Sequence, residues 1–348
     1  MSTMKAIAVT SPQQESLVTD RAIPALRDDY ILVKTVSVAL NPTDWKHIKF
    51  LAPPGCVIGC DYAGVVEAVG KNVKKSFKKG DRVCGFIHGG NAVQHEDGAF
   101  AEYVVAKGDI QIRIPDNLSF QEAATLGVGI STVGQGLYQS LGLALPTSPS
   151  TDSTPILIYG GSTATGTLAI QFAKLSGYKV LTTCSPHNFD LVKRLGADEV
   201  FDYKQPNAAA EIRKCTSNNL KLAFDTISLE SSAKFCDEAL STEGGDYSSL
   251  LTVGISRENI KDRYTLAYTA IGEEFQFGPT TFPAKPEDKA FAEKFWDMSA
   301  QLLADGKIKV HPPKVLPGGL EGVMKGLKLM SQDKVSGEKL VYNVEETP

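Results

Sequence analysis

The segment Ile156–Gly166, ILIYGGSTATG, carries the clearest chemical signal in the chain. An apolar run ends in two glycines, and an apolar-periodic segment follows from Gly166 to Leu175, which predicts a strand, a tight turn and a helix. Glycines let the backbone approach a pyrophosphate, and free N–H groups at a helix N-terminus favour an anion. The middle of this turn departs from a strict G-x-G-x-x-G pattern, so a plain connection is the alternative. We interpret it as the start of a dinucleotide-binding βαβ unit.

The next apolar run indicates which dinucleotide would bind. Lys179–Cys184 (KVLTTC) reads as the second strand, and Ser185-Pro186-His187-Asn188 follows it without an acidic residue. Sites that prefer NAD usually place Asp or Glu near this strand end to hold the ribose 2′-OH. Because that acid is absent and room is left for a 2′-phosphate, the sequence predicts NADPH as the cofactor.

The segments that follow this turn are expected to form the sheet and helices that position it. Strands and helices alternate, which predicts a parallel sheet covered by helices on both faces. The expected segments are helix His187–Leu195, strand Glu199–Phe201, helix Ala208–Cys215, strand Leu222–Phe224 and helix Ser231–Leu240.

The two ends of the chain have a different pattern. Short strand-like runs separated by turn residues predict a partly closed β-barrel from Tyr30–Ala39, Ala63–Val69, Arg82–Phe86 and Ala99–Val105. Leu143–Pro155 is rich in Pro, Ser and Thr and is expected to be a surface excursion or linker. Later segments predict amphipathic helices at Lys289–Asp305 and Gly319–Ser331, and a final strand, Lys339–Val344, that returns to the N-terminal part.

Length and composition bound the class of protein. A chain of 348 residues suits two domains, and 42% hydrophobic with 22% charged residues is ordinary for a globular protein. A net charge of −4 gives no electrostatic case for nucleic acid or membrane binding. The N-terminus lacks a secretory signal, and no apolar run approaches the roughly 20 residues that span a bilayer. Six cysteines form no disulfide framework, so we expect a cytoplasmic protein.

Five motifs in order resemble the medium-chain dehydrogenase/reductase superfamily. They are Asn41–Asp44 (NPTD), Gly59–Gly64 (GCDYAG), Gly80–Val83 (GDRV), Gly98–Tyr103 (GAFAEY) and the Gly-Gly turn. The resemblance implies an α/β protein in which a GroES-like β-barrel catalytic domain is interrupted by a Rossmann domain with a doubly wound parallel sheet. We place the catalytic domain at residues 1–125 and 276–348, and the NADPH-binding domain at residues 126–275.

Ligand counting at the superfamily's catalytic zinc site argues against a metal here. The three ligand positions hold Asn41, Cys60 and Val128, and one thiol cannot supply the three protein ligands that a catalytic zinc needs. No second cysteine lies between Cys84 and Ala99, so the four-cysteine structural site is missing too. Cys56 and Cys60 are expected to be small buried thiols. His88 and His95, on either side of a Gly-Asn loop, are expected at the surface.

Without a catalytic zinc, the acceptor that we expect for hydride transfer is a carbon–carbon double bond conjugated to a carbonyl. Hydride adds to the β carbon, and the resulting enolate oxygen needs hydrogen-bond donors in a dry pocket. Zinc-free members of the superfamily, the quinone and enoyl reductases, perform such reactions.

Four segments resemble more closely the fungal trans-acting enoyl reductases of polyketide biosynthesis. They are Gly160–Thr165 (GGSTAT), Cys184–Leu191 (CSPHNFDL), Gly196–Tyr203 (GADEVFDY) and Ser336–Val341 (SGEKLV). The resemblance implies an acyl thioester substrate on the acyl carrier protein of a polyketide synthase. The alternatives are a stand-alone quinone or enone reductase and a non-catalytic NADPH-binding protein.

The same resemblance assigns site residues. The catalytic candidates are Lys46 and Thr132, which would polarise the carbonyl or support proton delivery. The cofactor-binding set is Asn41, Pro42, Thr43, Asp44, Ser162, Thr163, Ala164, Thr165, Ser185, Pro186, His187, Asn188, Tyr203, Leu250, Leu251, Val335 and Ser336. The acyl pocket would be lined by Val128, Gly129, Ile130, Ser131, Thr132, Val133, Gly134, Gln135, Thr269, Ala270, Ile271, Gly272 and Glu273. A solvated Lys46 and a Thr132 hydroxyl satisfied by the preceding helical turn are the plain alternatives.

Two questions stay open. Mitochondrial-type enoyl reductases carry a catalytic Tyr after the NP-x-D motif, but Ile48–Pro54 holds Phe50 and no Tyr. Tyr62 belongs to the glycine-rich turn and is expected to be structural, which leaves the proton donor to the α carbon unassigned, with solvent as one source. Superfamily members often dimerise through an edge strand of the Rossmann sheet, expected here near Ser248–Gly254, whereas trans-acting enoyl reductases can be monomers.

Overall fold

The computed structural model describes residues 3–348, and its chain forms two compact units. The first unit contains residues up to 131 and from 268 onward, and the second contains residues 132–267. The second unit therefore interrupts the first, as the order of motifs predicts. The predicted boundaries at 125 and 275 fall near these divisions.

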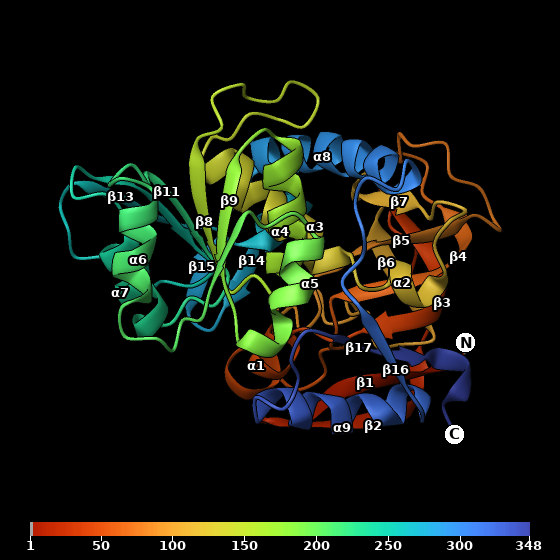
Figure 1. Ribbon diagram of the computed structural model, residues 1–348. Coiled ribbons are helices and arrows are strands. Elements are labelled where there is room, and N and C mark those ends of the chain that lie inside the picture. Colours follow the sequence, from red (N-terminus) through yellow and green to blue (C-terminus); the bar gives the residue numbers. More distant parts are fainter. Residues whose placement is uncertain (1–2) are drawn as a thin grey trace. The chain divides into compact units, whose positions relative to one another are not determined.

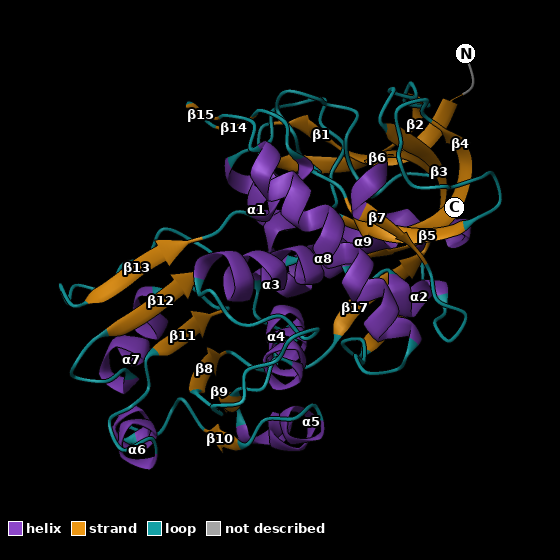
Figure 2. Ribbon diagram, turned by 90° about the horizontal axis from the view of Figure 1, so that it is seen from above, coloured by secondary structure: helices purple, strands orange, loops and turns teal. Residues whose placement is uncertain are grey.

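A six-stranded parallel sheet organises the second unit (Figures 1 and 2). Its strands are β8 (Pro155–Tyr159), β9 (Lys179–Thr183), β10 (Glu199–Phe201), β11 (Leu222–Asp225), β12 (Gly245–Ser249) and β13 (Ile260–Tyr264). The spatial order β10-β9-β8-β11-β12-β13 reverses direction next to β8, which is the doubly wound arrangement that binds dinucleotides. The predicted fold class is confirmed.

Helices cover both faces of this sheet. Figure 2 shows α4 and α5 on one face and α6 and α7 on the other. Their bounds are α4 (Ala164–Leu175), α5 (Phe189–Arg194), α6 (Ala208–Cys215) and α7 (Glu230–Ala239). Short helical segments complete the unit at η2 (Gly134–Ser140) and η3 (Pro186–Asn188), and α3 (Gly127–Val133) spans the division between the units.

The predicted edge of the sheet is wrong. Ser248 and Ser249 end β12, which pairs with β11 on one side and with β13 on the other. The edge strand is β13, whose sequence IKDRY places three charged residues in a row. Such a segment lacks the apolar alternation that identifies strands, and charged side chains are typical of exposed sheet edges.

A curved seven-stranded sheet forms the centre of the first unit. Its path is β16-β17-β3-β4-β5-β7, and β6 pairs with the first half of β3. Its strands are β3 (Tyr30–Ala39), β4 (Asp61–Val69), β5 (Arg82–Phe86), β6 (Tyr103–Lys107), β7 (Gln111–Arg113), β16 (Pro313–Leu316) and β17 (Lys339–Asn343). Strand β17 pairs antiparallel with β3, which confirms that the end of the chain returns to the N-terminal part.

Further elements surround this sheet. The hairpins are β1 (Thr3–Ser11) with β2 (Gln14–Ala22) and β14 (Phe275–Phe277) with β15 (Thr280–Phe282). The helices are α1 (Pro42–Phe50), α2 (Phe120–Ala123), α8 (Pro286–Ala304) and α9 (Gly319–Ser331), with the short segments η1 (Gly108–Ile110), η4 (Ala267–Ile271) and η5 (Val344–Glu346). The buried core joins Ile7, Val33, Phe100 and Leu327 from strands and helices far apart in the sequence.

One predicted strand of this unit begins later than expected. The apolar run 99–105 predicts a strand throughout, but β6 begins only at Tyr103. The residues before Tyr103 form hydrogen bonds with the irregular segment that contains Gly59: the Ala99 N–H donates to the Gly59 carbonyl. A Cβ on Gly59 would lie only 2.4 Å from the Phe100 ring, so only glycine fits at this position.

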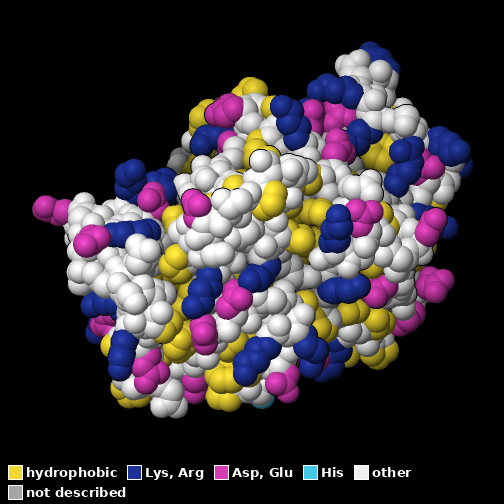
Figure 3. Space-filling view, turned by 45° about the horizontal axis from the view of Figure 1, so that its top comes forward, with side chains coloured by type: hydrophobic (Ala, Val, Ile, Leu, Met, Phe, Trp, Pro, Cys, Tyr) yellow, Lys and Arg dark blue, Asp and Glu magenta, His cyan; other side chains and the backbone are white. Residues whose placement is uncertain are grey.

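The surface fits the charge balance of the sequence. Acidic and basic side chains alternate over the face seen in Figure 3, and neither sign forms a continuous field there. Within residues 3–348, no helix is both long enough and apolar enough to cross a membrane.

Candidate functional site

The glycine turn after β8 has the close backbone approach that a phosphate site needs. Gly160 has a φ of +80°, in the left-handed region. A Cβ on Gly166 would lie 2.3 Å from the Gly160 carbonyl oxygen, and one on Gly161 would lie 2.0 Å from the Thr182 hydroxyl. Close contacts to a carbonyl and to a hydroxyl, which only glycine permits, therefore fix the turn. Helix α4 begins immediately after it and presents its free N–H groups at this point.

Threonines fix the geometry of this turn. The Thr163 hydroxyl accepts a hydrogen bond from the Gly166 N–H at 2.8 Å and so caps helix α4. It also lies 3.0 Å from the Thr226 hydroxyl, which donates to the Tyr159 carbonyl. These contacts join the predicted phosphate-binding residues to the ends of β8 and β11. The glycine turn and the capped helix fit the pyrophosphate of a dinucleotide.

The structure brings together two residues predicted to hold the adenosine end. Ser185 follows β9 and Tyr203 follows β10, and their hydroxyl oxygens lie 3.5 Å apart. Tyr203 is exposed, and its ring lies at 6.2 Å from that of Tyr159, at the end of β8. No acidic residue occupies the position directly after β9. Both hydroxyls are therefore accessible to a phosphate group.

Other predicted cofactor residues lie at separate places. Leu250 and the exposed Leu251 follow β12, where the Leu250 N–H donates to the Ser228 hydroxyl at 2.7 Å. Val335 packs on the core of the first unit in the segment between α9 and β17. Their assignment to the cofactor stays a prediction.

The NPTD motif forms the start of helix α1. The Asn41 N–H donates to the Asp44 carboxylate at 2.7 Å, and Pro42 occupies the first turn, where its missing N–H costs nothing. Burial raises the pKa of Asp44 to about 7, although the Asn41 hydrogen bond acts in the opposite direction. Asn41 Nδ2 and Asp44 Oδ1 are buried without a partner among residues 3–348.

Lys46 lies one turn further along α1 and is half-buried. Desolvation lowers the pKa of its ammonium, with a smaller opposing effect from Asp333. Its Nζ lies 5.8 Å from the centre of the Trp45 ring, and no described acceptor forms a hydrogen bond or ion pair with it. An ammonium that is partly desolvated and has no anionic partner is free to bind a carbonyl oxygen.

A buried ion pair holds the N-terminus of α1 to the sheet. Lys339 Nζ, on β17, lies 2.5 Å from Asp61 Oδ2, and both side chains are almost completely buried. The same ammonium donates to Asn41 Oδ1 at 2.8 Å and to the Thr125 carbonyl at 3.2 Å. Asp61 Oδ1 accepts from the Val128 N–H at 2.6 Å. One lysine therefore links β17 to the NPTD motif, to the start of β4 and to the segment before α3, a role that the motif SGEKLV did not reveal.

A cluster of aromatic and imidazole rings lies beside α1. Tyr268, on η4, packs with ring centres 4.2 Å from His88 and 5.3 Å from His47. Phe275 and Phe277 of the β14–β15 hairpin complete it. We call these five rings the aromatic cluster. The prediction that His88 lies at the surface is wrong: His88 is 3% exposed because Tyr268 and the two hairpin phenylalanines pack against its ring.

Burial favours the neutral form of both imidazoles of the aromatic cluster. Burial lowers the pKa of His47 to about 4, and burial together with His47 lowers that of His88. The Nε2 atom of each ring is buried and has no partner in the described part of the chain. The sequence could not reveal this cluster, because Tyr268 and the hairpin come from a segment far from α1.

The predicted metal-ligand positions lie in the first unit as small or neutral groups. Cys60 is buried, and desolvation together with Asp44 and Asp61 raises the pKa of its thiol. Cys56 is buried as well, as predicted. Among residues 3–348, no group of three or more His, Cys, Asp and Glu side chains could hold a metal ion. Zinc independence remains a prediction.

The segment 128–135 is packed closely. Ser131 Oγ accepts from the Trp296 indole N–H at 3.1 Å, which ties α3 to α8 within the first unit. Thr132 is 6% exposed and begins the second unit. Gly136, just after the segment, lies against the Phe224 ring, which a Cβ would approach to 2.3 Å. The assignment of this segment to the acyl pocket stays a prediction.

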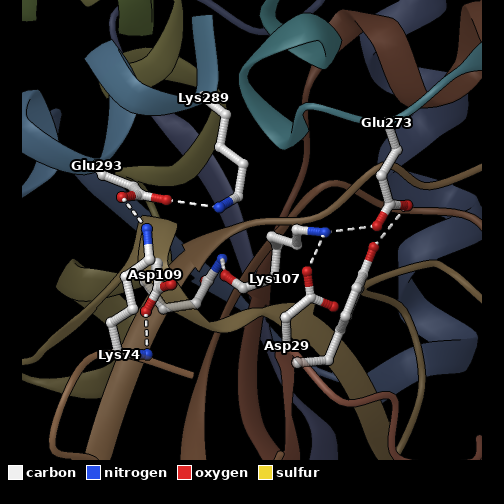
Figure 4. Close-up of polar contacts among 9 residues, drawn as sticks. Asp29, Lys74, Lys107, Asp109, Glu273, Lys289 and Glu293 are labelled. Atoms are coloured by element: carbon white, nitrogen blue, oxygen red, sulfur yellow. Dashed lines mark hydrogen bonds and ion pairs between the residues drawn. The ribbon is translucent and has the colours of Figure 1, made fainter. Parts of the chain in front are cut away.

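Glu273 anchors the segment that carries Tyr268 (Figure 4). Its carboxylate lies 2.6 Å from Lys107 Nζ and accepts from the Tyr30 hydroxyl at 2.8 Å. Lys107 also pairs with Asp29 at 2.6 Å. Glu273 thus has a structural role in holding η4 to β3 and β6, whether or not its neighbours Thr269, Ala270, Ile271 and Gly272 line a pocket.

A second charged group in Figure 4 fixes helix α8. Glu293 lies 2.5 Å from Lys289 and 3.2 Å from Lys74, whose backbone N–H donates to Asp109. Such pairs near the surface contribute little to stability individually. They link α8 to the loop between β4 and β5, which is itself bonded to η1 through Asp109.

Tyr62 is structural, as its position in the glycine-rich turn predicts. It is fully buried on β4 and donates to Gln111 Oε1 at 3.0 Å.

Comparison with known proteins shows the family to which this chain belongs. Two family models match: the alcohol dehydrogenase GroES-like domain over residues 27–116, and the zinc-binding dehydrogenase over residues 164–272. The trans-enoyl reductase TOXD of Cochliobolus carbonum is 66% identical over 85% of this chain and 99% of its own length. The trans-enoyl reductase resD of Aspergillus sclerotiorum is 50% identical over 98% of this chain and 100% of its own length.

Solved structures share the fold. The CurK enoyl reductase has a TM-score of 0.76 at 19% identity, and covers 98% of this chain and 99% of its own. The quinone oxidoreductase from Coxiella burnetii has a TM-score of 0.75 at 24% identity, with 99% and 100% covered.

Proposed function

We propose that this chain, which belongs to the trans-enoyl reductases within the medium-chain dehydrogenase/reductase superfamily, uses NADPH to reduce the C=C bond of α,β-unsaturated acyl thioesters. The observation that carries the proposal is the full-length similarity to trans-enoyl reductases. The nucleotide turn and the donor groups around α1 supply the required chemistry.

The nucleotide site would use groups already arranged by the second unit. The turn at residues 160–165 would hold the pyrophosphate, because its glycines leave the backbone accessible and α4 favours an anion. The hydroxyls of Ser185 and Tyr203 would bind the 2′-phosphate. When bound, the nicotinamide cofactor supplies a hydride to the carbon β to the carbonyl. The family shows that a nicotinamide cofactor is used, and the choice of NADPH is our proposal.

The chain's own task is to stabilise negative charge on the substrate. As the β carbon gains hydride, the π electrons of the double bond move to the thioester oxygen and form an enolate. Lys46 would bind that oxygen, since its ammonium is partly desolvated and forms no hydrogen bond or ion pair with the described residues. Thr132 would add a hydroxyl donor. A proton then joins the α carbon, the carbonyl re-forms, and the product has gained one hydride and one proton.

The partner would be a polyketide synthase that presents the enoyl group on its acyl carrier protein. The resemblance of residues 184–191 and 336–341 to the fungal trans-acting enzymes supports this partner. Monomer and homodimer both remain compatible with it.

The direct test is NADPH oxidation, followed by absorbance, with an enoyl N-acetylcysteamine thioester, a simple enone and a quinone as acceptors. We expect the thioester to give the highest kcat/KM, and the α,β-saturated thioester as product. Turnover of the quinone or enone alone would refute the proposal and favour a stand-alone reductase. Cofactor binding without any turnover would favour a non-catalytic NADPH-binding protein.

Cofactor choice has its own test. We expect Ser185→Ala to weaken NADPH binding several-fold and to leave NADH binding unchanged, because only NADPH carries the 2′-phosphate. Equal binding of NADPH and NADH by the parent protein would contradict the assignment.

A further inference from the structure

The Tyr268 hydroxyl meets the hydroxyl of Thr43 in the NPTD motif. The two oxygens lie 2.6 Å apart, and Tyr268 is only 7% exposed. Among the described residues, the other polar neighbour of the phenol is the Cys60 sulfur, a weak acceptor at 3.9 Å. All three residues belong to the first unit.

His47 decides which way the protons point. Its Nδ1 lies 2.9 Å from the Thr43 carbonyl oxygen and 3.1 Å from Thr43 Oγ1. Its Nε2 is buried without a described partner, and a buried N–H without an acceptor is rarer than an unused lone pair. The ring proton of this neutral imidazole therefore lies on Nδ1 and is donated to the Thr43 carbonyl.

The Tyr268 proton then has one good acceptor, Thr43 Oγ1. Because the phenol donates to this oxygen and His47 Nδ1 is itself a donor, the Thr43 hydrogen is left for a different acceptor. Thr43 is partly exposed, unlike its neighbours Asn41 and Asp44. It can therefore donate to a bound ligand.

We propose that Tyr268 is a positioning residue that holds the Thr43 hydroxyl as a hydrogen-bond donor to the carbonyl oxygen of the substrate. This inference rests on the proposed function. It adds Thr43 to Lys46 as a second hydrogen-bond donor from the first unit. The bond strengthens as negative charge collects on the oxygen in the enolate, so its loss reduces kcat more than it changes KM. The role would explain why a polar phenol is buried in the aromatic cluster.

The surrounding rings keep the phenol in place. His88, Phe275 and Phe277 pack on Tyr268 with ring centres between 4.2 and 5.9 Å away. Glu273 anchors the same segment through Lys107. Replacement of tyrosine by phenylalanine would keep these ring contacts and remove only the hydroxyl.

Four variants test the coupling by steady-state kinetics with an enoyl N-acetylcysteamine thioester. We expect Thr43→Val to lower kcat by about 100-fold, the usual effect of losing one oxyanion donor. Tyr268→Phe should lower kcat by about tenfold, as expected for loss of one orienting hydrogen bond. The double variant should be no slower than Thr43→Val alone, because the phenol acts only through Thr43. Thr43→Ser, which keeps the hydroxyl, should retain most of the activity.

Tyr62→Phe is the matched control, since it also removes one buried phenolic hydroxyl from the first unit. It should leave kcat unchanged, and thermal melting of every variant separates loss of folding from loss of rate. Multiplicative effects of Thr43→Val and Tyr268→Phe would overturn the inference. So would a Tyr268→Phe variant as fast as Tyr62→Phe, or an effect confined to the dissociation constant of NADPH.

The proposed function can fail separately. If the parent protein reduces cyclohexenone but no thioester, the substrate assignment fails, and the same variants assayed with cyclohexenone decide the inference, because this acceptor also forms an enolate. No turnover of either acceptor would overturn both.

Discussion

Removal of the Lys339 ammonium should destabilise the first unit strongly. Lys339→Met keeps most of the length of the side chain but leaves the buried Asp61 carboxylate without its counter-ion. It also removes the donors to Asn41 and to the Thr125 carbonyl. Breaking one partner of a buried ion pair costs about 3–5 kcal/mol. We expect the free energy of unfolding to fall by that amount.

Tryptophan fluorescence provides the assay. The only two tryptophans of the sequence, Trp45 and Trp296, both belong to the first unit, so their emission reports on this unit alone. With a urea m-value of about 2–3 kcal/mol/M, the loss would lower the midpoint by roughly 1–2 M.

Two further variants sharpen the comparison. Lys314→Met on the neighbouring strand β16 breaks an exposed pair with Glu338 and should cost less than about 1 kcal/mol. Adding Asp61→Asn to Lys339→Met removes the bare carboxylate and should recover part of the loss. A Lys339→Met variant as stable as Lys314→Met would refute the reasoning, and so would a double variant no more stable than Lys339→Met.

Gly166→Ala should weaken NADPH binding at least about tenfold, because the new Cβ would meet the Gly160 carbonyl. Gly142→Ala is the control: Gly142 has a positive φ but no atom near its Cβ position, so the change should affect only stability. Equal NADPH binding by the two variants in calorimetry would contradict this prediction. Burial raises the pKa of Asp44 from 3.8 to about 7, so its contribution to stability is full below pH 4 and is lost as the pH rises through 7. The difference in unfolding free energy between Asp44→Asn and the parent protein should therefore change mainly between pH 4 and 7, and a constant difference across a urea–pH series would disprove it. Metal analysis of purified protein should give far less than one zinc per chain, and stoichiometric zinc would overturn the ligand counting. Light scattering should give a monomer mass, because the charged edge strand β13 resists pairing, and a stable dimer would show that another surface associates.

Local patterns predicted much of the fold because strands and helices here have strong signals. The Rossmann strands around the glycine turn alternate with helices, and the observed bounds of β3, β5, β10, α6 and α9 coincide with those predicted. Predictions failed where the environment outweighs the local pattern. Strand β13 is charged, and His88 is covered by a hairpin that is distant in the sequence.

The candidate site divides in the same way. Motifs identified Asn41–Asp44 and the glycine turn, because each motif is a short continuous segment with a local geometric role. Tyr268 and Lys339 could not be found from spacing, since each acts on residues hundreds of positions earlier. Only the folded chain shows that the phenol reaches Thr43 and that the ammonium reaches Asp61.

The pairing of β17 with β3 has a consequence for synthesis of the chain. Val341 pairs with Ala39, so this part of the central sheet stays incomplete until almost the whole chain has left the ribosome. The second unit is continuous and can fold earlier. In the first unit, β4 pairs with one edge of the second half of β3, but the other edge stays open in the meantime. An unpaired strand edge invites aggregation. We expect nascent chains that lack β17 to depend on chaperones, and premature termination shortly before Lys339 to yield insoluble protein.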